Sequence, residues 1–351
     1  MSPSKTRVGV IGYGYWGPNL VRNFVANLKC EVVGVVDADP GARARCAALY
    51  PHVPVYAEVG ELLKRARPDG IAIATPPESH CALAIQCLEA GCDVLIEKPM
   101  AMSVEECDRI LAAGERVGRG VMVDHTFMYH PAVELLEKRV RDGDLGDLLY
   151  YDSVRVNFGG FQAGADVLWD LAPHDLSILD VLTRGKVPQT VSAVGVKHFD
   201  QAVANQCYLS LAYKGDFIAH VHLNWTAPVK LRTVMVAGTK KMAIYDDNLP
   251  AEKVKIYDRE VSLQPREAMD FRVSYRTGDM TAPAFFHREA LEGVVSAFLR
   301  MIAEGVPPKS DGESGRRMLQ ILEAATLSMH QGGVHKSTAS TSAPAARKRA
   351  A

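Results

Sequence analysis

The stretch RVGVIGYGYWGPNLVRNF, residues 7–24, joins a short apolar run to a helix-forming run through three glycines. Gly12, Gly14 and Gly17 have the spacing at which backbone N–H groups and a helix N-terminus can hold a pyrophosphate. The next apolar run, EVVGVVD, ends in Asp37, about twenty residues beyond Gly17, where a carboxylate can bind an adenosine ribose. The pattern predicts a dinucleotide-binding βαβ unit; the alternative is a tight βα turn in an ordinary doubly wound fold.

The residues around Asp37 favour NAD over NADP. A carboxylate at this position repels a 2′-phosphate, and Ala38 supplies no hydroxyl or guanidinium to bind one. Arg43, on the next predicted helix, could reach a 2′-phosphate or stack on the adenine.

Composition narrows the class of protein. A chain of 351 residues is expected to form two domains. Forty basic and 41 acidic side chains leave no net positive charge for binding nucleic acid or an anionic membrane, so a small molecule or another protein is the expected partner. Seven cysteines without a Cys-x-x-Cys pair, and no apolar run long enough for a membrane span, indicate a soluble cytoplasmic protein with reduced thiols.

The periodicity of the chain changes after its first third. Up to Asp124, short β-branched runs alternate with helical patterns, which predicts a doubly wound parallel sheet with strands near 7–12, 31–37, 70–75, 93–98 and 120–125. Longer alternating runs then predict a mostly antiparallel open sheet in an α+β domain, with strands near 148–158, 190–199, 205–213, 216–225, 231–238, 241–247 and 252–258.

These patterns give the expected domains. Residues 1–124 form the NAD-binding domain, 125–332 a substrate-binding and oligomerisation domain, and 333–351 a disordered tail. Helices near 286–304 and 315–329 close the second domain. The charged stretch 262–280 is expected to be a solvated loop, although its arginines could meet a phosphate or carboxylate of a substrate.

A lysine stands at the end of a predicted buried strand. DVLIEKPMAMS places Glu97 and Lys98 at the carboxyl edge of the parallel sheet, where open α/β folds bind their ligands. Lys98 could orient a substrate hydroxyl or join a proton relay. The alternative is a surface pair ahead of the loop-forming Pro99.

Four motifs recur in the same order in the Gfo/Idh/MocA oxidoreductase family, which this chain resembles over residues 7–330. They are the glycines of residues 12–17, TPPESH at 75–80, EKP at 97–99, and the pair Asp170 and His174. The resemblance implies a Rossmann domain, a second domain with a large open sheet often used for oligomerisation, and hydride transfer between a nicotinamide cofactor and a carbinol of a sugar, cyclitol or polyol. It also implies that Lys98 is the catalytic lysine and that Asp170 and His174 face the substrate. Its expected cofactor contacts are Gly12, Gly14, Tyr15, Trp16, Gly17, Asp37, Arg43, Thr75, Pro76, His80, Glu97 and Lys98.

The segment WDLAPHDLSILDVLTRG, residues 169–185, is predicted to be the catalytic helix. Asp170 and His174 are four residues apart and share one face. Since proline is tolerated in the first helical turn, Pro173 predicts a start near Asp170, which would then be the N-cap. His174 suits a general base, with Lys98 orienting the oxygen and stabilising developing alkoxide charge. The alternatives are that Asp170 only caps the helix and that His174 is a core histidine.

Two positions in this helix depart from the family pattern. Ala172 and Ser177 stand where many members have Gly and Asp. The second acid, Asp175, lies about 100° around the helix from His174 and cannot simply replace the missing one. The proton-relay partners beyond Lys98 and His174 are therefore left open.

Several other polar residues are candidates for the substrate site. Tyr129, Asn157 and Trp169 flank predicted strand ends and the glycine-rich loop ahead of the helix, with core packing of Tyr129 an equal alternative. His220 and His222 alternate onto one strand face, but no third ligand has suitable spacing, so a polar sheet face is favoured over a metal site.

The leading hypothesis is an NAD-dependent dehydrogenase, a homo-oligomer (dimer or tetramer), that oxidises a ring secondary alcohol to a ketone. The resemblance points to nucleotide sugars or aminoglycoside and aminocyclitol intermediates of antibiotic biosynthesis, with C3 as a candidate position and an aminotransferase as consumer of the ketone. Two alternatives are an NAD-dependent glycosidase of the same family and a non-catalytic NAD-sensing protein.

Overall fold

The computed structural model describes residues 5–159, 166–199, 203–265 and 271–339, and only the backbone of residues 259–265 and 271–275. By its internal contacts the chain divides into two compact units. Unit 1 comprises Met1–His130 and Arg288–Leu319, and unit 2 comprises Pro131–His287 and Gln320–Ala351. This division puts the first boundary after His130 and not after Asp124, and Arg288–Leu319, which follows the second sheet in the chain, belongs to unit 1.

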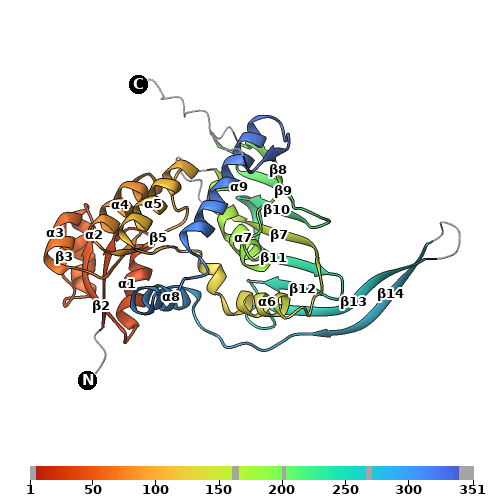
Figure 1. The fold of residues 1–351 in the computed structure, drawn as a ribbon, viewed down its shortest axis with the longest axis horizontal. Helices are drawn as coiled ribbons and strands as arrows, with labels where there is room; N and C mark the ends of the chain where they lie inside the picture. Colours follow the sequence, from red (N-terminus) through yellow and green to blue (C-terminus); the bar gives the residue numbers. More distant parts are fainter. Residues whose placement is uncertain (1–4, 160–165, 200–202, 266–270, 340–351) are drawn as a thin grey trace. The chain divides into compact units, whose positions relative to one another are not determined.

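Unit 1 contains a parallel sheet with strand order β3-β2-β1-β4-β5-β6, flanked by helices (Figure 1). The strands are β1 Thr6–Ile11, β2 Cys30–Val36, β3 Val55–Tyr56, β4 Gly70–Ile73, β5 Asp93–Ile96 and β6 Val121–Val123. The helices are α1 Gly17–Ala26, α2 Pro40–Leu49, α3 Val59–Ala66, η1 Pro77–Ser79, α4 His80–Glu89, α5 Val104–Val117, η2 Thr126–Tyr129 and α8 Ala290–Glu304. The predicted doubly wound Rossmann fold is confirmed.

Small residues let a helix approach this sheet closely. A Cβ added to Gly9 in β1 or to Gly34 in β2 would lie 2.7 or 2.5 Å from a side-chain carbon of Leu62. Leu62, on α3, is fully buried, so the two glycines make room for its side chain against the sheet. The strand order reverses between β1 and β4, and folds of this kind bind ligands beyond the carboxyl ends of the strands at such a point.

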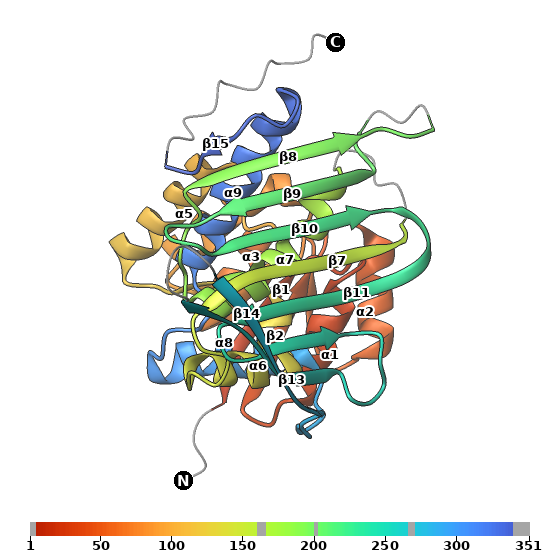
Figure 2. The same cartoon turned by 90° about the vertical axis from the view of Figure 1, so that its right-hand side faces the viewer.

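Unit 2 is built on a mixed sheet that contains nine strands among the described residues, in the order β14-β13-β12-β11-β7-β10-β9-β8-β15 (Figure 2). The strands are β7 Leu148–Phe158, β8 Thr190–Val196, β9 Gln206–Ala212, β10 Ile218–Asn224, β11 Thr226–Gly238, β12 Met242–Asp246, β13 Val254–Pro265, β14 Phe271–Thr281 and β15 Lys336–Ser337. Its pairs are antiparallel except β7 with β10, so the predicted mostly antiparallel sheet is confirmed.

The described residues of unit 2 also contain helices α6 Pro131–Arg141 and α7 Val167–Thr183. Helix α9, Gly312–His330, crosses the boundary between the units, and its second half belongs to unit 2. Helix α7 packs on β7, β9 and β10. In β9 and β10 every second residue is buried, as one covered and one open face require.

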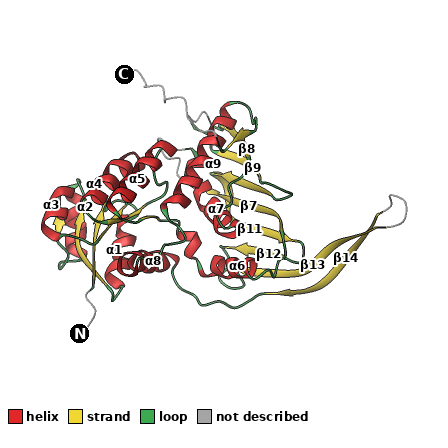
Figure 3. Cartoon of the chain, in the orientation of Figure 1, coloured by secondary structure: helices red, strands yellow, loops and turns green. Residues whose placement is uncertain are grey.

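Two stretches of unit 2 differ from their sequence-based expectations. The expected loop at 262–280 instead contains the end of β13 and nearly all of β14, which pair in a long antiparallel hairpin (Figure 3). The tail expected to be disordered from residue 333 begins with β15, which pairs with β8, while residues 340–351 lie outside the described part of the chain.

Candidate functional site

The turn after β1 requires glycine at two of its three positions. Gly12 has a φ of +96°, and a Cβ there would lie 2.5 Å from the carbonyl oxygen of Ala74. A Cβ on Gly17 would lie 2.0 Å from the carbonyl oxygen of Gly12, whereas one on Gly14 would meet nothing within 4 Å. The turn therefore leaves open space over its backbone at Gly14, as close approach of a pyrophosphate demands.

The start of α1 is also suited to an anion. Trp16 occupies the N-cap position, but its side chain makes no capping hydrogen bond. The Trp16 side chain therefore does not occupy the first N–H groups of the helix, which can bind an anion. The neighbouring Tyr15 is 93% exposed. The residues of this turn thus fit the phosphates of a dinucleotide.

Asp37 lies directly after β2, as expected, and its carboxylate is held by the backbone. Its Oδ2 accepts a hydrogen bond from the N–H of Tyr13 (2.6 Å) and its Oδ1 one from the N–H of Asp39 (2.8 Å). A carboxylate has about four acceptor positions, so capacity remains for ribose hydroxyls. Arg43 donates from Nη1 to the carbonyl oxygens of Asp37 (2.7 Å) and Ala38 (2.9 Å), and thereby braces the end of β2.

The TPPESH segment follows β4 and is tied to the loop that follows β5. Thr75 Oγ1 is 2.7 Å from Ser79 Oγ, and Pro76 is exposed ahead of η1. His80 is fully buried, with Nε2 2.9 Å from the carbonyl oxygen of Thr75 and Nδ1 3.0 Å from that of Pro99. Both ring nitrogens are engaged inside the protein, so His80 holds the two loops together.

The carboxyl ends of β5 and β6 bring four titratable residues together: Glu97, Lys98, Asp124 and His125, here called the strand-end cluster. The N–H of Lys98 donates to Oε2 of Glu97 (3.2 Å), and the N–H of Asp124 donates to the carbonyl of Ile96 (2.8 Å), which ties the two strand ends side by side. Burial, followed by the positive charges of Lys98 and Arg317, lowers the pKa of His125 to about 3. His125 is therefore neutral at physiological pH.

Sequence reasoning selected only Glu97 and Lys98 from this cluster. Asp124 accepts hydrogen bonds from Nε1 of Trp16 at Oδ2 (3.1 Å) and from Oγ1 of Thr126 at Oδ1 (2.9 Å). The available signal was the pair Asp124–His125 at the end of the last predicted parallel strand, a position equivalent to that of Glu97 and Lys98.

Tyr129 belongs to the core of unit 1. It is 3% exposed, and its hydroxyl lies 3.0 Å from Oγ of Ser310. Burial raises the pKa of Tyr129 to about 12, and Lys309 lies over its ring at 5.1 Å. These contacts favour core packing over the predicted substrate contact.

Helix α7 carries Asp170 and His174, but it starts three residues earlier than predicted. It begins at Val167 and is capped by Asp166, whose Oδ1 accepts a hydrogen bond from the N–H of Trp169 (2.9 Å). Pro173 lies inside the helix, where it removes only the hydrogen bond to the carbonyl of Trp169. Most of the helix is buried against the sheet, and this packing outweighs that loss.

The predicted substrate-facing residues of unit 2 have these surroundings. Oδ2 of Asp170 accepts a hydrogen bond from Nε1 of Trp225 (3.2 Å), and Nε1 of Trp169 donates to Oγ1 of Thr326 (3.0 Å). His174 is half-buried one turn beyond Asp170 on α7, and Asn157 is half-buried near the end of β7. The glycine-rich loop at 160–165 lies outside the described residues.

Asp175 forms a buried ion pair and not a second acid beside His174. Its Oδ2 is 2.5 Å from Nε of Arg155 on β7, and the two side chains are 1% and 3% exposed. The hydroxyl of Tyr151 also donates to the backbone carbonyl of Asp175 (2.9 Å). The pair fixes α7 to the sheet.

The described residues contain no group of three or more His, Cys, Asp or Glu that could hold a metal ion. His220 and His222 lie on the polar face of β10, where the ring of Tyr208 stacks on both, with centroid distances of 6.1 and 4.5 Å. This arrangement is a stack of rings on a sheet face.

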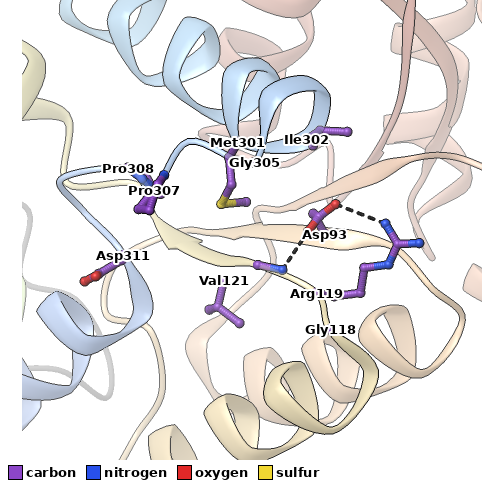
Figure 4. Close-up of a pocket in the computed structure, with 11 residues that line it drawn as sticks. Asp93, Gly118, Arg119, Val121, Met301, Ile302, Gly305, Pro307, Pro308 and Asp311 are labelled. Carbon is purple, nitrogen blue, oxygen red and sulfur yellow. Dashed lines mark hydrogen bonds and ion pairs between the residues drawn. The ribbon is translucent and has the colours of Figure 1, made fainter.

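A cavity of about 420 Å³ in unit 1 lies at the amino ends of β5 and β6 (Figure 4). Its lining includes Asp93 at the start of β5, Val121 at the start of β6, and Arg119. Asp93 accepts a hydrogen bond from the N–H of Gly120 (2.6 Å) and pairs with Arg119 (3.5 Å). This cavity therefore lies at the amino ends of strands whose carboxyl ends carry the strand-end cluster.

Two family models match the chain in the order of its units. Residues 6–125 match the model described as the oxidoreductase family with an NAD-binding Rossmann fold, and residues 133–244 match the Gfo/Idh/MocA C-terminal domain. Together they cover more than half of the chain. The chain belongs to the Gfo/Idh/MocA oxidoreductase family.

Relatives in this family include several dehydrogenases. The chain is 28% identical over 336 residues to UDP-N-acetylglucosamine 3-dehydrogenase of Acidithiobacillus ferrooxidans, a match that covers 89% of this chain and 94% of that protein. A crystal form of that dehydrogenase superposes with a TM-score of 0.80 at 26% identity, over 93% of this chain and 98% of the other. A 1-carboxy-3-chloro-3,4-dihydroxycyclo hexa-1,5-diene dehydrogenase of Comamonas testosteroni is 26% identical over 201 residues, 54% of this chain and 50% of that protein.

Membership of the Gfo/Idh/MocA family makes this chain an NAD-dependent oxidoreductase that acts on CH–OH groups. The glycine turn, the start of α1 and Asp37 are the parts of unit 1 that fit the NAD molecule. No helix in the described part of the chain is long and apolar enough to cross a bilayer.

Proposed function

We propose that this enzyme oxidises a ring secondary alcohol of a sugar to a ketone, at C3 of a nucleotide sugar or an aminocyclitol-type intermediate, and that an aminotransferase consumes the ketone. The observation that carries the proposal is the near full-length match to a UDP-N-acetylglucosamine 3-dehydrogenase, together with the lysine at the carboxyl end of β5. A ring ketone is the substrate class from which an aminotransferase makes an amino sugar.

Three residues are proposed to handle the hydroxyl group of the substrate. Lys98 orients the oxygen and stabilises the negative charge that develops on it, and His174 accepts the hydroxyl proton. Asp170, one turn before His174 and held by Trp225, faces the same substrate. Bound NAD supplies the hydride acceptor. Asn157 and Trp169 are proposed as further substrate contacts, and Tyr129 is left out because its hydroxyl is engaged in the core.

The open face of the unit 2 sheet supports the proposal of a homo-oligomer. Val194, Tyr208 and Ile218 are 50%, 43% and 52% exposed on that face. Val194 and Tyr208 lie opposite each other in the β8–β9 pair, and neighbouring exposed apolar side chains are typical of a subunit interface. Sedimentation velocity of the wild-type chain and of an Ile218→Glu variant would show whether this face joins subunits: a monomeric wild type contradicts the proposal.

The experiment that tests the function begins with the cofactor. Purified protein is heat-denatured, any released nucleotide is identified, and formation of reduced nicotinamide is followed with NAD and a panel of activated sugars and aminocyclitols. Lys98→Ala and His174→Ala should each lower turnover by about two orders of magnitude or more. Lys64→Ala, an exposed lysine on α3, is the matched control and should turn over like the wild type.

The double variant tests whether Lys98 and His174 serve one reaction. Residues that act together give effects that do not add, so the double variant should lose little more than the worse single variant. No hydride transfer in either direction with the panel would contradict the proposed substrate class. Release of free sugar without net cofactor reduction would instead identify a glycosidase. A signalling response to NAD binding that is unchanged in Lys98→Ala would identify a sensor.

A further inference from the structure

One carboxylate oxygen in the strand-end cluster is enclosed without a donor. Oε1 of Glu97 is buried, and no N–H or O–H group among the described residues donates to it. Its Oε2 accepts a hydrogen bond from the N–H of Lys98, at 3.2 Å. A buried carboxylate that lacks donors is costly, and protonation removes that cost.

Asp124 has the opposite environment. Its two oxygens accept hydrogen bonds from Trp16 and Thr126, which stabilise the ionised form, and the residue is 2% exposed. Glu97 and Asp124 directly follow Ile96 and Val123, which are partners in the parallel β5–β6 pair, so the two residues lie side by side at the strand ends. Burial raises the pKa of Glu97 well above its ordinary value, and the charge and hydrogen bond of Asp124 raise it further, against a smaller opposing effect of Lys98.

We propose that Glu97 and Asp124 are positioning residues that share one proton, so that the pair places a single negative charge beside Lys98. The proton lies on Glu97, whose hydroxyl donates to the ionised Asp124. The other titratable groups around the pair add positive or no charge: Lys98 is a cation, His125 is neutral because its pKa is about 3, and Tyr129 is neutral because its pKa is about 12.

The kinetic consequence rests on the proposed function. As pH rises through the raised pKa of Glu97, the pair goes from one negative charge to two. A second negative charge next to Lys98 opposes the negative charge that develops on the substrate oxygen, so turnover should fall. In Glu97→Gln the amide still donates to Asp124 but cannot ionise, and this decline should disappear from the pH profile of kcat.

Infrared difference spectroscopy of the purified full-length chain tests the proton itself, without any substrate. The wild-type minus Glu97→Gln spectrum at neutral pH should contain the C=O stretch of one protonated carboxylic acid, which shifts in D₂O. Loss of a carboxylate band alone would overturn the proposal. Because this readout needs no turnover, it can fail or succeed separately from the proposed function.

Two further variants keep the test decisive. Asp93→Asn, at the opposite end of β5, removes a buried carboxylate paired with Arg119 and should leave the carboxylic acid band intact. Asp124→Asn retains Glu97 and serves if Glu97→Gln does not fold. Without the neighbouring charge, the band should disappear at a lower pH than in the wild type; an unchanged titration would also overturn the proposal.

Discussion

Two clusters of buried titratable residues in this enzyme differ in how completely their polar atoms are hydrogen-bonded. In unit 2, Arg155 and Asp175 are both nearly inaccessible and meet at 2.5 Å in a closed ion pair. In unit 1, the strand-end cluster buries Oε1 of Glu97 and Nε2 of His125 without a hydrogen-bond partner among the described residues. Each unsatisfied buried group costs about 1–3 kcal/mol. The ion pair of unit 2 is hydrogen-bonded, whereas the strand-end cluster lacks partners. The energetic cost therefore falls on the residues whose shifted pKa values can serve catalysis.

The largest effect is expected from breaking the closed pair. Asp175→Asn leaves the Arg155 guanidinium buried without its counter-charge, which should lower the free energy of unfolding by about 3–5 kcal/mol. Urea unfolding followed by circular dichroism measures this. Replacing both residues, Arg155→Met with Asp175→Leu, should recover most of the loss, because no charge is left buried. A loss below about 1 kcal/mol in Asp175→Asn would show that the pair is not closed as described.

The strand-end cluster should respond to acid instead. The folded protein holds His125 neutral to about pH 3, whereas in the unfolded chain it takes up a proton near pH 6.5. The unfolded state therefore binds more protons between these values, and stability falls as pH falls. By pH 4 the contribution of His125 is a loss of about 3 kcal/mol.

A comparison of two chains isolates this contribution. Glu97, with its raised pKa, changes stability in the opposite direction over the acid range, but it is present in both wild type and His125→Gln. Subtracting their urea unfolding free energies at pH 7 and pH 4 leaves the contribution of His125. A variant that loses as much stability as the wild type on acidification would contradict the buried neutral histidine.

Local patterns predicted most of the fold because the strands of unit 1 are buried on both faces and read as continuous apolar runs. Strand β3 was missed, since two residues, Val55–Tyr56, carry no periodicity. Strand β14 differs from the predicted loop because its charged stretch carries no strand signal, whereas pairing with β13 decides its conformation. Helix α7 starts earlier than Pro173 predicts because the burial of the helix offsets the cost of an internal proline, and that burial is not visible in the local sequence.

The candidate site was predictable only where its residues stand in a motif. The motifs that contain Glu97, Lys98, Asp170 and His174 are enough by themselves to predict roles for these residues. Arg155 and Asp175 meet because α7 packs on β7, and Glu97 lies beside Asp124 because β5 pairs with β6, although each pair is far apart in the sequence. The spacing of residues along the sequence therefore does not predict these contacts.

The smallest predicted effect separates Asp166, the N-cap of α7, from Asp170, which lies four residues later in the helix. The side chain of Asp166 caps the helix by accepting a hydrogen bond from the N–H of Trp169, so its role is structural, like that of the buried ion pair. Asp170 is the proposed substrate-facing acid. Asp166→Ala should lower the free energy of unfolding by about 1 kcal/mol and leave turnover at low temperature near that of the wild type. Asp170→Ala should lose turnover without a capping loss, because the cap remains. If Asp170→Ala instead destabilises the protein more than Asp166→Ala and retains activity, then Asp170 is the structural acid and the assignment of this helix to catalysis rests on His174 alone.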